Sequence, residues 1–214
     1  MSPARSVAVS EPARRSHRDV AAFDLRAASY EDGWRAQLHR EITTRTAALA
    51  AREARAPSRI LDVGCGTGQL LRLLASKFPT ARELRGLDPA PSMLAFATTH
   101  VEDPRLSFDA GDAEHLPYPD GHFDLVVTTT SFDHWSDQAA GLQQCARVLD
   151  NGGLFVLVDL FSLLLAPTLL GQRRHKARTK GRVGPLLDAA GLSQPVWHDL
   201  YTPIIKAVTA CRAR

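Results

Sequence analysis

The residues best suited to chemistry begin with a glycine-rich loop, in which Gly64, Gly66 and Gly68 follow the apolar run 59–63. Glycines at the end of a strand let the backbone approach a ligand closely. The spacing differs from the dinucleotide pattern GxGxxG, because the third glycine comes one residue early, and no lysine follows as in a P-loop. Asp62 would repel a pyrophosphate but suits an ammonium or sulfonium group. The alternative is a strand-to-helix turn that simply needs small residues.

Two further acids are expected at the ends of the next strands. Asp88 ends the run 84–88, twenty residues after Gly68, where a carboxylate can accept both hydroxyls of a ribose. It can also cap the helix that starts near Pro89, and one residue can serve both roles. Asp112 closes the third strand and can accept a hydrogen bond from an exocyclic amine such as that of adenine. A nucleoside with a positive charge fits these three acids, and the chemistry points to S-adenosylmethionine.

The loop after the apolar run 123–129 carries the candidates for a role in the reaction. Within the loop 130–135, His134 is a candidate general base, because an unperturbed imidazole titrates near neutrality. The alternative is an imidazole that packs or hydrogen-bonds beside the ligand. Asp133 is its neighbour in sequence, so the two side chains need not form a dyad. No spacing of histidine, cysteine and aspartate resembles a metal site.

Alternating strands and helices must position these residues. Neighbouring parallel strands have their carboxyl ends at the same edge of a sheet. The helices of βαβ units cover such a sheet on both faces. Only Thr202 and Pro203 separate the last two strands, so this pair must be antiparallel. We expect strands at 59–63, 84–87, 106–108, 123–129, 154–159, 196–201 and 204–211, and helices at 69–78, 91–99, 138–149 and 185–190.

The N-terminal part differs in character from this alternating core. Residues 1–18 are predicted to be a disordered arm, and apolar residues at helical spacing predict one or two helices over 20–55. The start of the sequence has no apolar core of a signal peptide, and the run 160–170 is about half as long as the ~20 residues that span a membrane. With three widely spaced cysteines, we expect a soluble, cytoplasmic protein without a membrane span.

The net charge of +3 is concentrated in two segments. Residues 1–18 hold four arginines and one acid, residues 172–182 hold six basic residues and no acid, and the remaining residues carry 16 basic against 22 acidic side chains. The basic run comprises Arg173, Arg174, Lys176, Arg178, Lys180 and Arg182. It is interpreted as a solvated loop, with nucleic-acid binding as the alternative.

Four ordered motifs, LDVGCGTG, GLDPAPSML, GDAEHLPYPDGHFDLVVTT and RVLDNGGLFVLVD, resemble those of class I S-adenosylmethionine-dependent methyltransferases. The resemblance is to the small-molecule branch with the ubiquinone- and menaquinone-type enzymes (methyltransferase type 11-like), and it runs from residue 20 onwards. It implies an α/β, three-layer, Rossmann-like sheet of seven mostly parallel strands whose last strand is antiparallel. Related enzymes often have two histidines before the aromatic residue of the loop, whereas this sequence has Asp133 and His134.

The resemblance also implies roles for individual residues. The glycine loop would hold the methionine moiety, Asp88 the ribose, and Asp112 with Ala113 the adenine, with Met93 as a packing residue or a core residue. The N-terminal helical segment would close over the sulfonium, with Phe23, Tyr30 and Trp34 as its aromatic candidates or as ordinary packing residues. The residues expected to contact the cofactor are Tyr30, Asp62, Gly64, Cys65, Gly66, Gly68, Asp88, Pro89, Met93, Asp112, Ala113 and Thr129, and His134 is the expected catalytic residue.

The expected organisation is an arm (1–18), a helical lid segment (19–56) and a methyltransferase domain (57–214), in a monomer or homodimer. The expected partner is a small, apolar or aromatic methyl acceptor, because the apolar run 160–170 lies where such enzymes bind acceptors. A dimer surface or a core helix would also explain the apolar composition of this run. Oxygen is the favoured acceptor atom. An RNA methyltransferase or a non-catalytic S-adenosylmethionine-binding protein are the alternatives, and the absence of an Asn/Asp-Pro-Pro-aromatic motif and of a Pro-Cys pair at the fourth strand disfavours a nucleic-acid enzyme.

Overall fold

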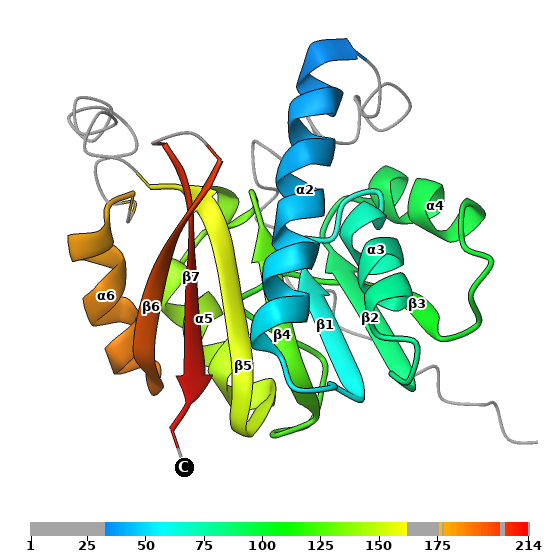
Figure 1. Ribbon diagram of the computed structural model, residues 1–214. Helices are drawn as coiled ribbons and strands as arrows, with labels where there is room; N and C mark the ends of the chain where they lie inside the picture. The colour runs from blue at the N-terminus through cyan, green and yellow to red at the C-terminus, as the bar shows by residue number, and fades with distance from the viewer. Residues whose placement is uncertain (1–32, 162–175, 177, 202–203, 214) are drawn as a thin grey trace, which may run out of the picture.

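A computed structural model describes residues 33–161, 176, 178–201 and 204–213 of the chain. The expected arm, Phe23, Tyr30 and most of the run 160–170 lie outside the described residues. Seven strands form one sheet in the order β3-β2-β1-β4-β5-β7-β6, with helices on both of its faces (Figure 1). The strands are β1 (Arg59–Val63), β2 (Glu83–Asp88), β3 (Leu106–Ala110), β4 (Phe123–Thr129), β5 (Leu149–Leu160), β6 (Leu192–Tyr201) and β7 (Ile205–Arg212).

The strand directions confirm the predicted topology. β1 pairs in parallel with β2 on one side and with β4 on the other, and β7 runs antiparallel to both β5 and β6. The chain therefore winds outwards from β1 in one direction and from β4 in the other. At such a switch in strand order, the carboxyl ends of the strands form a crevice that parallel α/β proteins use to bind ligands.

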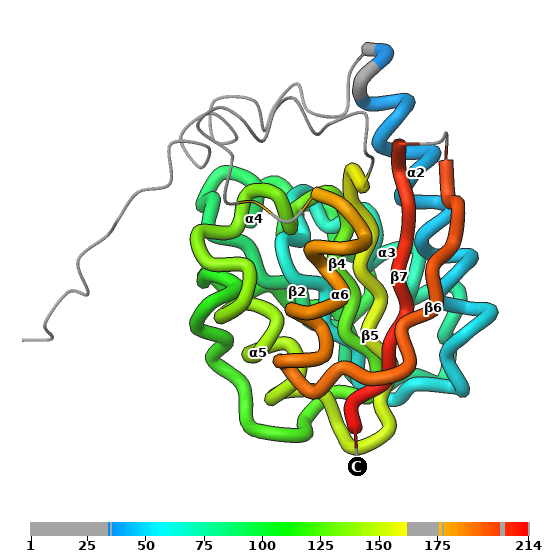
Figure 2. The backbone as a smooth tube through the Cα atoms, turned by 90° about the vertical axis from the view of Figure 1, so that its left-hand side faces the viewer, coloured from blue at the N-terminus to red at the C-terminus, as the bar shows by residue number. Residues whose placement is uncertain are grey.

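Two apolar cores lie on opposite faces of the sheet. Helices α2 (Gly33–Glu53) and α3 (Gln69–Lys77) contribute to one, and α5 (Gln138–Val148) and α6 (Lys180–Ala189) to the other, while α4 (Pro91–Thr99) contacts β3 and β2. The view along the sheet shows β7 between α6 and α2 (Figure 2). Fully buried strands such as β4 have apolar, β-branched sequences because helices cover both of their faces.

The helix α2 is one continuous element and belongs to the helical layer. Ile42, Leu49 and Ala50 are buried in the core shared with α3, because apolar residues recur at the helical period. Trp34, at the N-terminal end, is 71% exposed. The residues before Gly33 lie outside the described ranges, so the closure of this segment over the site stays a prediction. None of the helices in the described ranges has the length and apolar character needed to cross a membrane.

Three elements begin four or five residues before their predicted starts. β5 begins at Leu149 and not after the glycine pair, because Gly152, at φ +76°, lets the strand make an irregular turn within its length. β6 begins at Leu192, and a register shift near Gln194 (φ +56°) interrupts its pairing with β7. α6 begins at Lys180, so the end of the basic run is helical and not a loop.

Candidate functional site

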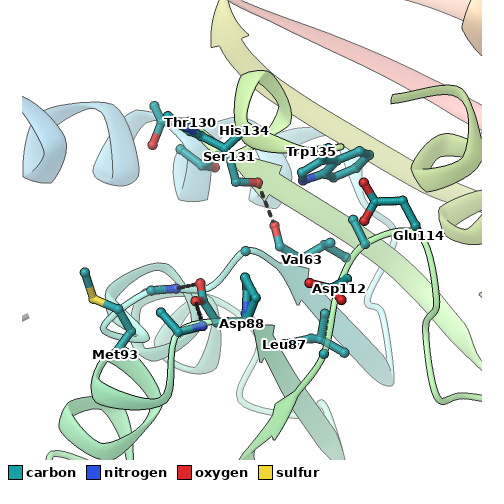
Figure 3. A pocket seen from close by; sticks show the side chains of 17 residues that line it. Val63, Leu87, Asp88, Met93, Asp112, Glu114, Thr130, Ser131, His134 and Trp135 are labelled. Atoms are coloured by element: carbon teal, nitrogen blue, oxygen red, sulfur yellow. Dashed lines mark hydrogen bonds between the residues drawn. The ribbon is translucent and has the colours of Figure 1, made fainter. Parts of the chain in front are cut away.

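A pocket opens at the carboxyl ends of β1, β2 and β4, at the switch in strand order (Figure 3). Nine residues that the sequence predicted line it together: Gly64, Gly66, Asp88, Pro89, Met93, Asp112, Ala113, Thr129 and His134. The other lining residues are Val63, Leu87, Ala90, Gly111, Glu114, Thr130, Ser131 and Trp135. They come from the ends of the strands and from the loops that follow them, which places several different chemical groups around one cavity.

The glycine loop reaches the pocket through its backbone. The amides of Gly64 and Cys65 donate to the carbonyl of Leu87 over 2.7 and 3.1 Å, which joins the loop to the end of β2. Gly64 has φ +76°, and a Cβ there would lie 2.4 Å from the Cβ of Ser131, so only glycine fits. A Cβ on Gly66, in contrast, would meet no heavy atom within 4 Å. The backbone at Gly66 therefore faces open space, as a ligand-cradling loop requires.

Three predicted residues do not line the pocket, and two of them serve packing. A Cβ on Gly68 would lie 2.7 Å from the ring of Phe108, so this glycine makes room for the contact between helix and strand. The Sγ atom of Cys65 lies beside Gly86, and burial raises the pKa of the thiol, as do Asp88 and Asp62. The predicted contacts of Gly68 and Cys65 with the cofactor thus have no support from the pocket's geometry.

Asp62 is the third residue behind the pocket wall. It is 2% exposed, and within the described part of the chain no hydrogen bond to its carboxyl group is recorded. Burial, and secondarily the charge of Asp88, raises the pKa of Asp62 to about 8. A cation placed nearby would offset both effects and restore the charged form. The electrostatics at the end of β1 therefore favour a positively charged ligand.

Asp88 connects the glycine loop to the next helix. One carboxylate oxygen, Oδ2, accepts the amide of Gly66 over 2.8 Å, and the other, Oδ1, accepts the amide of Ala90 over 2.9 Å (Figure 3). Asp88 lines the pocket, but the N-cap position of α4 belongs to Ala90, whose amide Asp88 accepts, so the expected cap is not formed by Asp88 itself. Its role toward a ribose stays a prediction. Met93, 2% exposed, follows on the first turns of α4 and lines the same wall.

The opposite wall is built by the residues after β3. Asp112 and Ala113 line it as predicted, and Glu114, which sequence reasoning missed, lines it beside them. The Oε1 atom of Glu114 accepts the amide of Asp137 over 2.9 Å, so the acid also ties this loop to the start of α5. The signal in the sequence that could have identified Glu114 was its position two residues after Asp112. Among the described lining residues, three are acids and none is a lysine or arginine.

The end of β4 carries local strain and an unmet polar atom. Thr130 adopts φ +53°, a left-handed backbone conformation that is strained for a β-branched residue. The hydroxyl of Ser131 donates to the carbonyl of Val63 over 3.0 Å and lies 2.6 Å from the hydroxyl of Thr128. Within the described residues, the buried hydroxyl oxygen of Thr129 has no hydrogen-bond partner. Strain and an unsatisfied polar atom together mark this segment as one that a ligand completes.

His134 lies on the 3₁₀ turn η2 (Phe132–His134) and lines the pocket, and its neighbour Asp133 is bound by Arg178. The two carboxylate oxygens of Asp133 accept the guanidinium of Arg178, from Nε over 2.6 Å and from Nη2. Arg178 is 9% exposed, so the interpretation of the basic run as a solvated loop is wrong for this residue. The described residues contain no cluster of three or more metal-ligating side chains.

The seven-stranded sheet with one antiparallel strand is a Rossmann-like fold that this chain shares with solved S-adenosylmethionine-dependent methyltransferases. A structure of such an enzyme from Aquifex aeolicus matches with a TM-score of 0.70 at 16% identity, over 89% of this chain and 98% of that one. Residues 61–157 match the family model described as "Methyltransferase domain". This part of the chain is accordingly similar to a methyltransferase domain.

Curated relatives agree with this assignment. The demethylmenaquinone methyltransferase of Deinococcus radiodurans is 40% identical over 117 residues, which are 54% of this chain and 48% of that protein. The ajmaline N-methyltransferase of Rauvolfia serpentina is 28% identical over 137 residues, which are 62% of this chain and 46% of that protein. The chain thus spans about half the length of the curated relatives that it matches, and these relatives carry names with different acceptors.

Proposed function

We propose that the chain transfers a methyl group from S-adenosylmethionine to a small molecule without a negative charge, with oxygen as the acceptor atom. The observation that carries the proposal is the position of Asp88, whose carboxylate accepts the amide of Gly66 in the glycine loop and lines the pocket. Asp62 behind the loop supports it, because its raised pKa favours a cationic ligand. Both acids belong to the matched methyltransferase domain.

The residues of the pocket suit this cofactor in distinct ways. Asp88 would accept the ribose hydroxyls, Met93 would pack on the base, and Asp112 would accept the adenine amine. The open backbone at Gly66 and the unpartnered hydroxyl of Thr129 would face the methionine moiety. S-adenosylmethionine supplies an electrophilic methyl group on a good leaving group. The protein has mainly to align the acceptor, exclude water and, for a hydroxyl acceptor, take up a proton.

His134 is the candidate to take up that proton. It lines the pocket on η2, at the end of β4, whereas the other described histidines do not line it. A neutral imidazole can accept a proton from a hydroxyl. Trp135 beside it offers an apolar surface for an aromatic or apolar acceptor. The proposal of an oxygen acceptor depends on this histidine, because an amine acceptor can release its proton to water after transfer.

The charge of the pocket disfavours an anionic acceptor. Asp88, Asp112 and Glu114 line it, and the described lining includes no lysine or arginine that would pair with a phosphate. The buried cation Arg178 is already bound by Asp133 and so is withdrawn from the surface. A negative pocket favours a cationic cofactor and a neutral acceptor. We therefore do not favour the RNA methyltransferase alternative.

Two measurements test the proposal. Calorimetry with S-adenosylmethionine and S-adenosylhomocysteine should give saturable binding of both, with the positively charged cofactor bound more tightly at pH 8. A screen with a labelled methyl group over quinols, phenols, alkaloid amines and small carboxylic acids should then find transfer to a neutral aromatic compound. Absence of binding to either ligand would refute the proposal. Tight binding without transfer to any acceptor would favour a non-catalytic S-adenosylmethionine-binding protein.

A further inference from the structure

A buried ion pair lies directly behind the pocket, on the side of η2. Arg178 places Nε 2.6 Å from Oδ1 of Asp133, and its Nη2 donates to Oδ2, so the guanidinium holds the carboxylate with both arms. The side chains are 11% and 8% exposed. They are 45 residues apart in sequence. A bidentate pair of this kind fixes geometry in a way that a single charge contact does not.

The same turn is held at several other points. The amide of Asp133 donates to Oδ2 of Asp159 at the end of β5 over 3.1 Å, and the side-chain amide of Gln138 donates to the carbonyl of Phe132 over 3.0 Å. The ammonium of Lys176 donates to the carbonyl of Trp135. Lys176 and Arg178 belong to one short stretch of chain, and both bind the turn that carries His134. This stretch therefore docks on η2 through two basic side chains.

The turn needs such anchors because its own hydrogen bonds are few. The amide of His134 donates to the carbonyl of Ser131 over 2.9 Å, and the amide of Trp135 donates to the carbonyl of Phe132 over 3.3 Å. A 3₁₀ turn of three residues has poor internal geometry and gains its stability from contacts with the rest of the molecule. The aromatic contact between Phe132 and Trp135, with centroids 5.1 Å apart, adds packing but no fixed direction. The ion pair adds direction at Asp133, together with the hydrogen bonds from Gln138 and Lys176.

We propose that Arg178 is a positioning residue, which through Asp133 sets the orientation of η2 and thereby holds His134 and Trp135 at the edge of the pocket. The proposal rests on the proposed function only in taking that edge as the acceptor side. It also explains why an acid, Asp133, precedes His134 in the loop: the acid serves the arginine and not the histidine. A neutral side chain at position 133 would remove the carboxylate that binds the buried guanidinium with both of its oxygens.

The test compares four variants by fluorine NMR of protein labelled with fluorotryptophan. The chain has three tryptophans, so the spectrum has one resonance each for Trp34, Trp135 and Trp197, and the exposed Trp34 is an internal reference. The variants are Arg178→Met, Arg178→Lys, the double variant Asp133→Leu with Arg178→Met, and Arg182→Met. The last makes the same substitution at an exposed position of the same basic run and is the matched control. Melting temperature and S-adenosylhomocysteine affinity are measured on each.

Arg178→Met should lower the melting temperature by several degrees, because it leaves Asp133 buried without its partner. The double variant removes both charges and should regain most of the melting temperature. Its Trp135 resonance should nevertheless shift and broaden, because the directional bonds are gone, while the affinity for S-adenosylhomocysteine changes less than about threefold. Arg178→Lys should move the same resonance by an intermediate amount, because an ammonium cannot hold both carboxylate oxygens. Arg182→Met should leave all three resonances in place.

A double variant with the Trp135 resonance at its original position would overturn the proposal, since η2 would then hold its orientation without the pair. An equal shift in Arg182→Met would overturn it as well, because the effect would not depend on the ion pair. Failure of the proposed function gives a different result: S-adenosylhomocysteine would not bind to the unmodified protein, while the Trp135 resonance would still report on the turn. The two proposals can therefore fail separately.

Discussion

Two walls of the same pocket treat a buried aspartate in opposite ways. At the end of β1, Asp62 is 2% exposed, and the protein supplies it with no cationic partner among the described residues. On η2, Asp133 is 8% exposed and is held by both arms of Arg178. The unpaired acid raises the free energy of the ligand-free protein, which a cationic ligand can recover, whereas the paired acid stabilises a fixed backbone. The comparison distinguishes an acid that we propose to favour a cationic ligand from one that holds the backbone.

The largest effect is expected for Asp88→Ala. The substitution removes both hydrogen bonds that the carboxylate makes to the backbone and its proposed bonds to the ribose. Hydrogen bonds to a charged group contribute about 1.5–3 kcal/mol each, so S-adenosylhomocysteine affinity should fall by about 100-fold or more. Calorimetry measures the change. Asp120→Ala, which alters an acid with a side chain 74% exposed, is the control and should leave the affinity unchanged. Unchanged affinity in Asp88→Ala would remove the ribose assignment.

His134→Ala should lower kcat by about 100-fold if the imidazole is a general base, with little change in cofactor affinity. The measurement is single-turnover transfer to the acceptor found in the screen, over a series of pH values. The alanine variant should be slower than the unmodified enzyme throughout the series. A His134→Ala enzyme with unmodified rates throughout the series would show that the imidazole only packs beside the ligand.

Asp62→Asn should have opposite effects on stability and on binding. In the folded, ligand-free protein the pKa of Asp62 is about 8, above the usual value near 4 in an unfolded chain. The folded state therefore holds the proton more firmly, and the stability of the free protein falls as pH rises from about 4 to about 8. The amide cannot ionise, so above pH 8 the variant should melt a few degrees higher while it binds S-adenosylmethionine about tenfold more weakly.

Proton release on ligand binding tests the raised pKa of Asp62 more directly. A cationic ligand lowers the pKa of Asp62, so the unmodified protein should release part of a proton when it binds near pH 7. Calorimetry in two buffers with different ionisation enthalpies measures this release, and Asp62→Asn should abolish it. Any proton that the α-amino group of the ligand releases is released in both complexes, so this contribution cancels in the comparison. Equal proton release in both proteins would mean that Asp62 does not sense the cofactor.

The sequence was sufficient for the pocket because parallel strands bring their ends to one edge. Gly64, Gly66, Asp88 and Asp112 come directly after predicted strands, so topology alone places them together. Packing could not be predicted in the same way. The sequence does not reveal that Gly68 faces Phe108, because a glycine for a close helix contact and one for ligand approach have the same letter. The start of β5 at Leu149 was missed because an Asn-Gly-Gly sequence usually ends an element.

The Asp133–Arg178 pair was also beyond prediction from the sequence. The partners are 45 residues apart, and no periodic pattern relates them. A basic run is in most proteins a solvated surface, and nothing in the composition of residues 172–182 singles out the one arginine that is buried. The only visible signal was Asp133 itself, an acid where related enzymes often carry histidine. An acid in an otherwise apolar turn implies a partner, but its identity came from the structure.

The smallest effect concerns Thr129, which extends the comparison to a neutral group. Its hydroxyl oxygen is buried beside the pocket with no hydrogen-bond partner in the described chain, whereas the hydroxyl of Ser131 two residues later donates to Val63. Thr129→Val keeps the shape and removes an unsatisfied polar atom, so the ligand-free protein should become more stable by about 1 kcal/mol. If the cofactor uses this hydroxyl, the affinity for S-adenosylhomocysteine should fall by about three- to tenfold.

Ser131→Ala is the matched control for that substitution, because it removes a hydroxyl that the protein already uses. It should lower the melting temperature, since the carbonyl of Val63 loses its donor, and should leave the affinity almost unchanged. Differential scanning calorimetry and titration with S-adenosylhomocysteine measure both quantities on the same samples. A Thr129→Val protein that is more stable and binds as tightly as the unmodified one would assign the buried hydroxyl to local strain at Thr130. A stabilised protein that binds more weakly would place Thr129 with Asp62, among the groups that the fold leaves unsatisfied for the ligand.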